Sequence, residues 1–273
     1  MNAPIGVFDS GVGGLSVLKA LRAELPLENF IYIADSAHAP YGERDDVHVI
    51  DRSRAVVAYL VSQNIKALVI ACNTATAAAV DLLRAEHPTL PIIGVEPALK
   101  PAVALSKTGH IAVMATRSTL ASARFQALMA AHNGLARVTV VPCDGLADAI
   151  ERSASTQNAT EIIAICARIA CGIGLFGSRK EHIDTLVLGC THYPFAAAHL
   201  RTLVGPDVQI VDNGEAVARQ TRRQLEKTGV LLASPGLAVM GNIGLFSTGQ
   251  TQPLQAAARH WLELQVSSRM LHF

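Results

Sequence analysis

The amino-acid sequence predicts an α/β fold with two pseudo-symmetric, doubly wound parallel-sheet domains that face each other across a cleft. Short Val- and Ile-rich runs alternate with helix-like segments along the chain, which is typical of parallel sheets covered by helices. Two motifs of the first half also recur in the second half. Because ligands of such folds bind beyond the carboxyl ends of the strands, the residues that follow each run are the first candidates for a site.

Each predicted strand is a short apolar run bounded by Gly, Pro, Asp or Asn. Four or five uninterrupted apolar residues suit a strand that is buried on both faces. Between the first two runs, leucines recur at about helical spacing from Leu15 to Leu25, and Pro26 ends the pattern. The predicted strands are Ile5–Phe8, Phe30–Ala34, Ala67–Ala71, Ile92–Val95, Ile111–Met114, Val138–Val141, Thr185–Leu188 and Val208–Val211.

The second half of the chain echoes two features of the first half. The run that begins at Ile5 and leads into Asp9 resembles the run that begins at Ile111, and the strand before Cys72 resembles the strand before Cys190. Prolines and glycine collect at 95–101 and 203–207, which predicts the seams between domains. We expect one domain over residues 1–96 and about 208–262, whose sheet the run 208–211 would rejoin, and a second domain over 97–207.

The composition argues against a nucleic-acid or membrane partner. Of the 273 residues, 23 are Lys or Arg and 22 are Asp or Glu, so the formal net charge is +1. The five cysteines are odd in number and form no Cys-X-X-Cys pair, which favours a reducing compartment. Residues 1–4 carry no basic cluster, and the apolar run Ile162–Phe176 is shorter than the roughly 20 residues of a membrane span. We therefore expect a cytoplasmic protein, with a buried helix at this run.

Cys72 and Cys190 are the strongest candidates for chemistry. Each follows an apolar run and precedes a polar side chain, which places a thiol where a strand passes into a loop or a helix start. Backbone N–H groups and the helix dipole at such a place favour the thiolate form. Cys143, Cys166 and Cys171 lack this context and are interpreted as buried packing residues.

Several uses of two such thiols are open at this point. Zinc would need four ligands at a recognisable spacing, which the sequence lacks, and a disulfide disagrees with a reducing compartment. His192 lies two residues after Cys190 and offers a Cys–His nucleophile. A further use places an acid and a base on opposite faces of one carbon atom, and a near-repeat of one motif supplies such a matched pair.

Two turns that follow predicted strands are further candidates. Residues 9–14, Asp-Ser-Gly-Val-Gly-Gly, would let backbone N–H groups approach a ligand, but they could also form a tight turn needed only for packing. The carboxylate of Asp9, directly after an apolar run, is costly unless it is paired or functional. Pro40-Tyr41-Gly42 is either an ordinary turn or a loop that covers a small ligand.

Together these motifs resemble the cofactor-independent aspartate/glutamate racemase family. Residues 9–14, 40–42 and 72–74 occur in the family's order, and residues 189–194, Gly-Cys-Thr-His-Tyr-Pro, are similar to the glutamate racemase branch that serves bacterial peptidoglycan synthesis. The resemblance implies interconversion of L- and D-glutamate by proton transfer at Cα between two cysteines. It also implies that the reaction uses neither a cofactor nor a metal.

The resemblance implies roles for individual residues. Cys72 would be the base for D-glutamate and Cys190 the base for L-glutamate, each acting as the acid in the opposite direction. Asp9 and His192 would assist these thiols, and Glu151 would support His192. The substrate-binding residues would be Asp9, Ser10, Tyr41, Gly42, Asn73, Thr74, Thr191 and His192, with Thr116 and Thr119 at the border of the site.

The chain departs from the family's pattern in a few places, and some alternatives stay open. His38 lies in a variable stretch, residues 211–215 differ from the commoner ending, and residues after about 241 match nothing. The apolar segment around Trp261 could pack internally or form a homodimer with a second copy of the chain. Alternative functions are a racemase of aspartate or another amino acid, or a protein that closes on an amino acid without chemistry.

Overall fold

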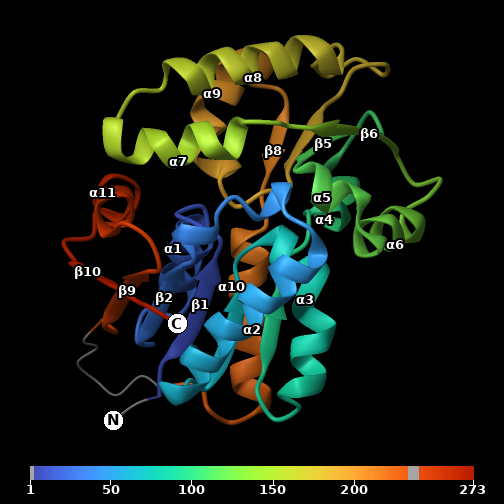
Figure 1. Cartoon of the computed structure of the whole chain (residues 1–273). Coiled ribbons are helices and arrows are strands. Elements are labelled where there is room, and N and C mark those ends of the chain that lie inside the picture. Colours follow the sequence, from blue (N-terminus) through green and yellow to red (C-terminus); the bar gives the residue numbers. More distant parts are fainter. Residues whose placement is uncertain (1–2, 233–239) are drawn as a thin grey trace.

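The computed structural model describes residues 3–232 and 240–273, and within them the chain forms two parallel sheets flanked by helices (Figure 1). The predicted α/β fold class is therefore confirmed. The first sheet contains β1 (Ile5–Asp9), β2 (Phe30–Ala34), β3 (Ala67–Ile70), β4 (Ile92–Gly94), β9 (Ile243–Ser247) and β10 (Ser268–Met270). The second sheet contains β5 (His110–Ala115), β6 (Arg137–Pro142), β7 (Thr185–Leu188) and β8 (Gln209–Val211).

Helices connect and cover these strands. The α-helices are α1 (Leu15–Glu24), α2 (Asp46–Ser62), α3 (Asn73–Glu86), α4 (Leu99–Leu105), α5 (Arg117–Ala121), α6 (Ala123–Ala131), α7 (Leu146–Thr156), α8 (Thr160–Ile173), α9 (Ala197–Val204), α10 (Gly214–Lys227) and α11 (Thr251–Leu262). Short 3₁₀ helices are η1 (Ser36–His38), η2 (Tyr41–Glu43) and η3 (Tyr193–Ala196). In the described residues, no helix has both the length and the apolar character needed to span a membrane.

The two sheets share one order of strands, which explains the echo in the sequence. Four neighbouring strands of the first sheet follow the order β2-β1-β3-β4, and the second sheet follows the order β6-β5-β7-β8. The central strands β1, β3 and β7 are buried at every residue, as expected for strands covered by helices on both faces. The strand-end motifs of Cys72 and Cys190 therefore occupy equivalent places in the two sheets.

The prediction that residues 208–211 rejoin the first sheet is wrong. Strand β8 pairs with β7 in the second sheet, with Leu186 opposite Ile210. A short crossover through α9 brings the chain to this neighbouring edge, and β8 thereby takes the place that β4 has in the first sheet. The return to the first sheet starts one strand later, where α10 packs against α1. Residues 233–239, inside the range predicted for the first domain, lie outside the described residues.

The C-terminal part of the chain adds two strands to the first sheet, and the sequence analysis predicted neither strand. Strand β9 pairs with β2 and strand β10 pairs with β9, both in parallel. Helix α11 lies between this edge and α7 of the second half (Figure 1). Trp261 on α11 stacks on Phe195 of η3, with ring centroids 3.7 Å apart, so the segment around Trp261 packs within the chain.

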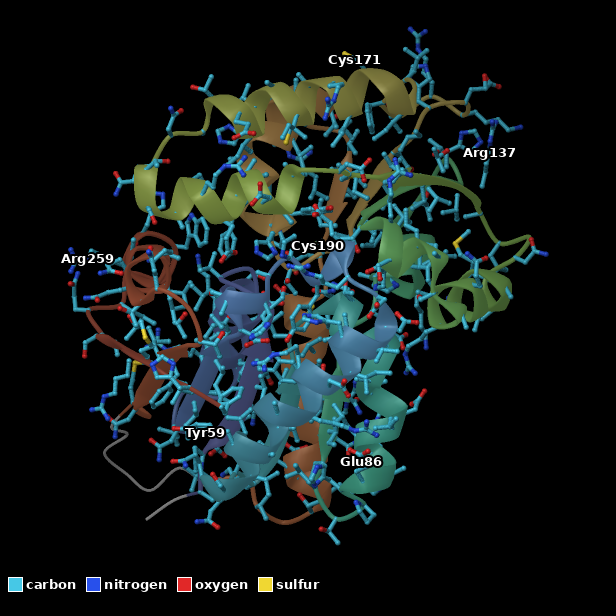
Figure 2. All side chains as sticks on the ribbon, viewed as in Figure 1. Tyr59, Glu86, Arg137, Cys171, Cys190 and Arg259 are labelled. Atoms are coloured by element: carbon cyan, nitrogen blue, oxygen red, sulfur yellow. The ribbon has the colours of Figure 1, made fainter. Side chains whose placement is uncertain are left out.

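Helix α8 is buried along one face only. Cys166 lies on the buried face, whereas Cys171 is exposed at the outer surface of the molecule (Figure 2), so the prediction of a buried Cys171 is wrong. The difference follows from the helical period, because residues five positions apart point in directions that differ by more than a quarter-turn. Cys143 is buried, as predicted.

Candidate active site

The candidate site lies where the carboxyl ends of both sheets meet. Asp9 ends β1 and Cys72 follows β3 in the first sheet, while Thr116 follows β5 and Cys190 follows β7 in the second. In parallel sheets these ends share one edge, so four chemically active side chains from distant parts of the sequence come together. Figure 2 places Cys190 between the two bodies of the molecule.

Cys72 is the N-cap of α3. The backbone N–H of Ala75 donates to Cys72 Sγ at 3.4 Å, and the thiol lies 4.0 Å from the hydroxyl oxygen of Ser10. Burial, followed by the negative charge of Asp9, raises the pKa of Cys72 well above its ordinary value and outweighs the stabilising N–H of Ala75. Without a ligand, Cys72 is therefore a neutral thiol.

Asp9 is buried beside this thiol. The backbone N–H of Gly14 donates to Asp9 Oδ2 at 2.7 Å, and Oδ1 has no partner among the described residues that meets hydrogen-bond geometry. Burial raises the pKa of Asp9, although the nearby His192 and the N–H of Gly14 lower it. A buried carboxyl group with a raised pKa is suited to holding or passing a proton.

Cys190 has a different environment, because a histidine and a glutamate stand behind it. His192 Nδ1 lies 3.8 Å from Cys190 Sγ, and His192 Nε2 lies 2.7 Å from Glu151 Oε2. Burial lowers the pKa of His192, but the bonds to Cys190 and Glu151 raise it more, so the net pKa lies well above the ordinary value. The imidazole is therefore held as a cation 3.8 Å from the second sulfur.

Glu151 links this group to the first sheet. The backbone N–H of Val12 donates to both oxygens of its carboxylate, at 3.2 and 3.0 Å. The glycines around Val12 give the space for this approach, since a Cβ atom at Gly11 would lie 2.5 Å from Glu151 Oε2 and one at Gly13 would overlap the ring of His192. The turn at residues 9–14 thus admits side chains of the second half.

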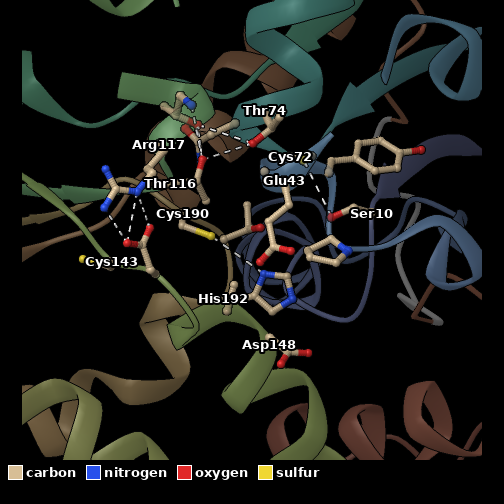
Figure 3. A pocket seen from close by; sticks show the side chains of 18 of the residues that line it. Ser10, Glu43, Cys72, Thr74, Thr116, Arg117, Cys143, Asp148, Cys190 and His192 are labelled. Atoms are coloured by element: carbon tan, nitrogen blue, oxygen red, sulfur yellow. Dashed lines mark hydrogen bonds and ion pairs between the residues drawn. The ribbon is translucent and has the colours of Figure 1, made fainter. Parts of the chain in front are cut away.

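A cavity of about 200 Å³ lies between the two cysteines (Figure 3). Pockets for drug-sized ligands are ~300–1,000 Å³, so this one suits a molecule as small as an amino acid. Ten of the predicted catalytic and substrate-binding residues line the cavity, as do Thr116 and Thr119 from the predicted border, whereas Glu151 lies behind His192. Those ten are Asp9, Ser10, Tyr41, Gly42, Cys72, Asn73, Thr74, Cys190, Thr191 and His192.

The wall of the cavity also contains residues that the sequence did not reveal. Arg117 and Asp144 form an ion pair at 2.7 Å, and Glu43, Cys143 and Asp148 also line the cavity. Arg117 and Asp144 each lie just beyond the carboxyl end of a strand of the second sheet, β5 and β6, which is the signal that could have identified them. Cys143 is both a packing residue and part of the wall.

Hydroxyl and amide groups face the cavity from both halves. The hydroxyl oxygen of Thr74 lies 3.3 Å from that of Thr116, and Thr116 donates to Thr119 at 2.9 Å. Both amide atoms of buried Asn73 lack a hydrogen-bond partner among the described residues. A buried unpaired amide is costly, so Asn73, which lines the cavity, is suited to binding a polar ligand there. Among the described residues, no cluster of three or more His, Cys, Asp or Glu side chains could hold a metal ion.

Comparison with known proteins places this arrangement in a family. Residues 15–221 match the family model described as Asp/Glu/Hydantoin racemase. The chain belongs to this racemase family. The resemblance inferred from the sequence motifs is therefore confirmed, and the matched residues include strands of both sheets.

Relatives of the racemase family match nearly the whole chain. A glutamate racemase from Ectopseudomonas mendocina (strain ymp) is 45% identical over 258 residues, which are 93% of this chain and 92% of that protein. The crystal structure of glutamate racemase isoform RacE1 from Bacillus anthracis has a TM-score of 0.84 at 32% identity, over 99% of this chain and 97% of that one. Glutamate racemase from Francisella tularensis subsp. tularensis SCHU S4, solved in complex with D-glutamate, has a TM-score of 0.81 at 25% identity, over 99% and 98% of the two chains.

Proposed function

We propose that this chain interconverts L- and D-glutamate without a cofactor, by proton transfer at Cα between Cys190 and Cys72. The observation that carries the proposal is the placement of two strand-end thiols from equivalent positions of two sheets in the wall of one small cavity. Inversion of a tetrahedral carbon needs a base on one face and an acid on the other, and this arrangement supplies both. The names of the relatives and the D-glutamate bound to one of them support glutamate as the substrate.

The two sulfurs have different surroundings, and these assign one cysteine as the initial base and the other as the initial acid. With L-glutamate, the Cys190 thiolate, stabilised by the His192 cation, takes the Cα proton and forms a thiol. The neutral thiol of Cys72 then gives its proton to the opposite face of the carbanion and becomes a thiolate, and D-glutamate results. In the reverse direction, Asp9 is the adjacent group that can accept the proton of Cys72 before the reaction.

The Cα–H of glutamate is a very weak acid, so the cavity must stabilise negative charge that develops at this carbon. We assign the substrate's carboxylate and ammonium groups to Ser10, Asn73, Thr74 and Thr191, with the backbone of Tyr41 and Gly42 beside them. Each oriented donor in a water-poor cavity contributes on the order of 10²–10³ in rate. Burial of these side chains keeps them oriented before the substrate arrives.

The product of the proposed reaction, D-glutamate, can serve as a building block in biosynthesis. We propose that the chain supplies D-glutamate for peptidoglycan synthesis in the cytoplasm, in line with the racemases to which it is similar. We also propose a homodimer, which light scattering on the purified protein tests directly.

Racemisation in heavy water tests the mechanism. With the wild-type protein and pure L-glutamate, we expect the D-glutamate product to contain deuterium at Cα, which NMR detects. Cys72→Ala and Cys190→Ala should each lower turnover by at least about 100-fold, the range of general acid–base catalysis. Cys166→Ala, a buried cysteine away from the cavity, is the matched control and should retain activity.

Three outcomes contradict the proposal. Normal racemisation by either single variant would exclude the two-cysteine scheme. A faster reaction with aspartate would replace glutamate as the substrate. Binding of glutamate with unchanged optical rotation would indicate a binding protein.

A further inference from the structure

Tyr41 lines the cavity, but its hydroxyl group is occupied elsewhere. The side chain is 1% exposed, and its hydroxyl donates to Asp35 Oδ2 at 2.6 Å. Asp35 directly follows β2 and is itself buried, outside the wall of the cavity. Tyr41 can therefore contact a ligand through its backbone and its ring. The position of both depends on the bond that holds the hydroxyl group.

The bond to Asp35 is the polar tether of the Pro40–Glu43 loop. The other hydrogen bonds of this loop are local: Glu43 N–H donates to the carbonyl of Pro40, and Arg44 N–H donates to the carbonyl of Tyr41. Among the described residues, Tyr41 makes the loop's one hydrogen bond to a residue outside 40–44. The local bonds fix the shape of the loop, and the bond from Tyr41 to Asp35 is the polar contact that holds it in place.

Asp35 is held by two further segments of the chain. Arg52 of α2 donates from Nε to Oδ2 at 3.0 Å and from Nη2 to Oδ1 at 2.9 Å, and Thr248 after β9 donates to Oδ1 at 2.8 Å. The ring of Phe273 covers the guanidinium group of Arg52 at 5.4 Å. A bidentate Arg–carboxylate pair is rigid as well as strong. The carboxylate is therefore a fixed point to which Tyr41 is attached.

The opposite side of the loop lines the cavity together with Cys72 and Thr116. Tyr41 and Cys72 pack in one hydrophobic cluster, and a Cβ atom at Gly42 would lie 3.1 Å from Thr116 of the second half. The loop is thus confined between Asp35 on one side and the walls of the cavity on the other. A small shift of its position would change the backbone groups that face the substrate.

We propose that Asp35 is a positioning residue, whose carboxylate holds the hydroxyl of Tyr41 and thereby fixes the Tyr41–Gly42 loop against the bound amino acid. Arg52 and Thr248 hold Asp35 in turn, so the C-terminal strand β9 contributes to the site without touching it. The inference rests on the proposed function, because it assigns the loop to the binding of glutamate.

Steady-state kinetics on Asp35→Asn, Tyr41→Phe and Thr248→Val test the proposal. A loop that contacts the substrate equally in the ground and transition states affects KM and leaves kcat. We expect Asp35→Asn and Tyr41→Phe each to raise KM for glutamate about tenfold with kcat within about threefold, and Thr248→Val to raise KM about threefold. Asp35→Asn combined with Tyr41→Phe should raise KM no further than either change alone, because both act on one bond.

Asp184→Asn is the matched control. Asp184 is a buried carboxylate with four donors, like Asp35, but it serves the turn at residues 106–109, away from the cavity. The control should lose stability in thermal unfolding and retain the wild-type KM.

Equal KM values for Asp35→Asn and Asp184→Asn would overturn the positioning role. So would effects on KM that multiply in the double variant of Asp35 and Tyr41. If Asp35→Asn fails to fold, Tyr41→Phe and Thr248→Val decide, and an unchanged KM in both overturns it. A wild-type protein that does not racemise glutamate would instead overturn the proposed function.

Discussion

Gly13 shows how closely the two halves of the chain approach each other at the site. A Cβ atom at this position would overlap the imidazole of His192, which belongs to the second half. The backbone of Gly13 does not have a positive φ angle, so the need for glycine comes from space and not from conformation. This differs from the usual reason for a glycine in a turn.

We predict that Gly13→Ala lowers racemisation of glutamate by about 100-fold, because displacement of a catalytic group by about 1 Å has this effect. Gly172→Ala is the control, since the added methyl group on α8 meets no atom within 4 Å beyond its chain neighbours and the adjacent backbone of its own helix. That change should keep activity and raise stability by about 0.5–1 kcal/mol, as Ala replaces Gly within a helix. Polarimetry and urea unfolding measure both effects, and an active Gly13→Ala would contradict the role of close approach.

The sequence indicated the residue types of the site better than their contacts. Cys72 and Cys190 could be selected because the same context, an apolar run before the thiol and a polar side chain after it, occurs twice. The bonds from Val12 to Glu151 could not be predicted, because they join residues 139 positions apart. Nothing local in the sequence around Asp35 indicates that its carboxylate takes donors from three other segments.

At the scale of elements, local pattern identified the early strands and failed near the C-terminus. The runs before Asp9 and Cys72 are continuous and apolar, so each could be assigned without knowledge of its neighbours. Strand β9 contains Gly244 in its interior and pairs with β2, from which more than 200 residues separate it. Strand β9 therefore forms because it pairs with the edge of β2, and its own sequence is a weak signal for a strand.

Helix α11 joins the two halves, because it packs against α7 and also stacks Trp261 on Phe195. Trp261 is the one tryptophan of the chain, and it packs against core clusters of both halves. Its ring lies nearly parallel to that of Phe195, at 12°, on the short helix that follows Cys190 and His192. The stacking therefore connects α11 to the segment that follows the second cysteine.

We predict that Trp261→Ala lowers the free energy of unfolding by about 1–3 kcal/mol, since a stacked, partly buried aromatic ring is lost. Trp261→Phe should lose less, because a ring can still stack on Phe195. Circular dichroism during urea unfolding measures the change. Phe195→Ala combined with Trp261→Ala should cost less than the sum of the single changes, and strict additivity would show that the rings do not interact.

At the scale of the whole molecule, two carboxylates of similar design stabilise the two halves separately. Burial raises the pKa of Asp35, but the bonds from Arg52, Tyr41 and Thr248 lower it more, so the net pKa lies below 3.8. The pKa of Asp184 is also lowered, because its bonds from Ser106, Thr108 and Lys107 outweigh burial. A carboxyl group with a lowered pKa in the folded state adds stability above its unfolded pKa and loses it as the pH falls through its folded pKa.

This sign predicts how the protein responds to acid. Near pH 7, Asp184→Asn should unfold with a free energy about 1–3 kcal/mol lower than the wild type, because the amide replaces a charged acceptor of several hydrogen bonds. As the pH falls below 3.8, Asp184 of the wild type takes up a proton that the amide of the variant never binds, and the difference between the two proteins should shrink. Urea unfolding of both proteins from about pH 7 to about pH 3 measures this difference. If the difference in the free energy of unfolding stayed constant over that range, the charge of Asp184 would not contribute to stability. Only the packing of its side chain would, since a steric effect does not depend on ionisation.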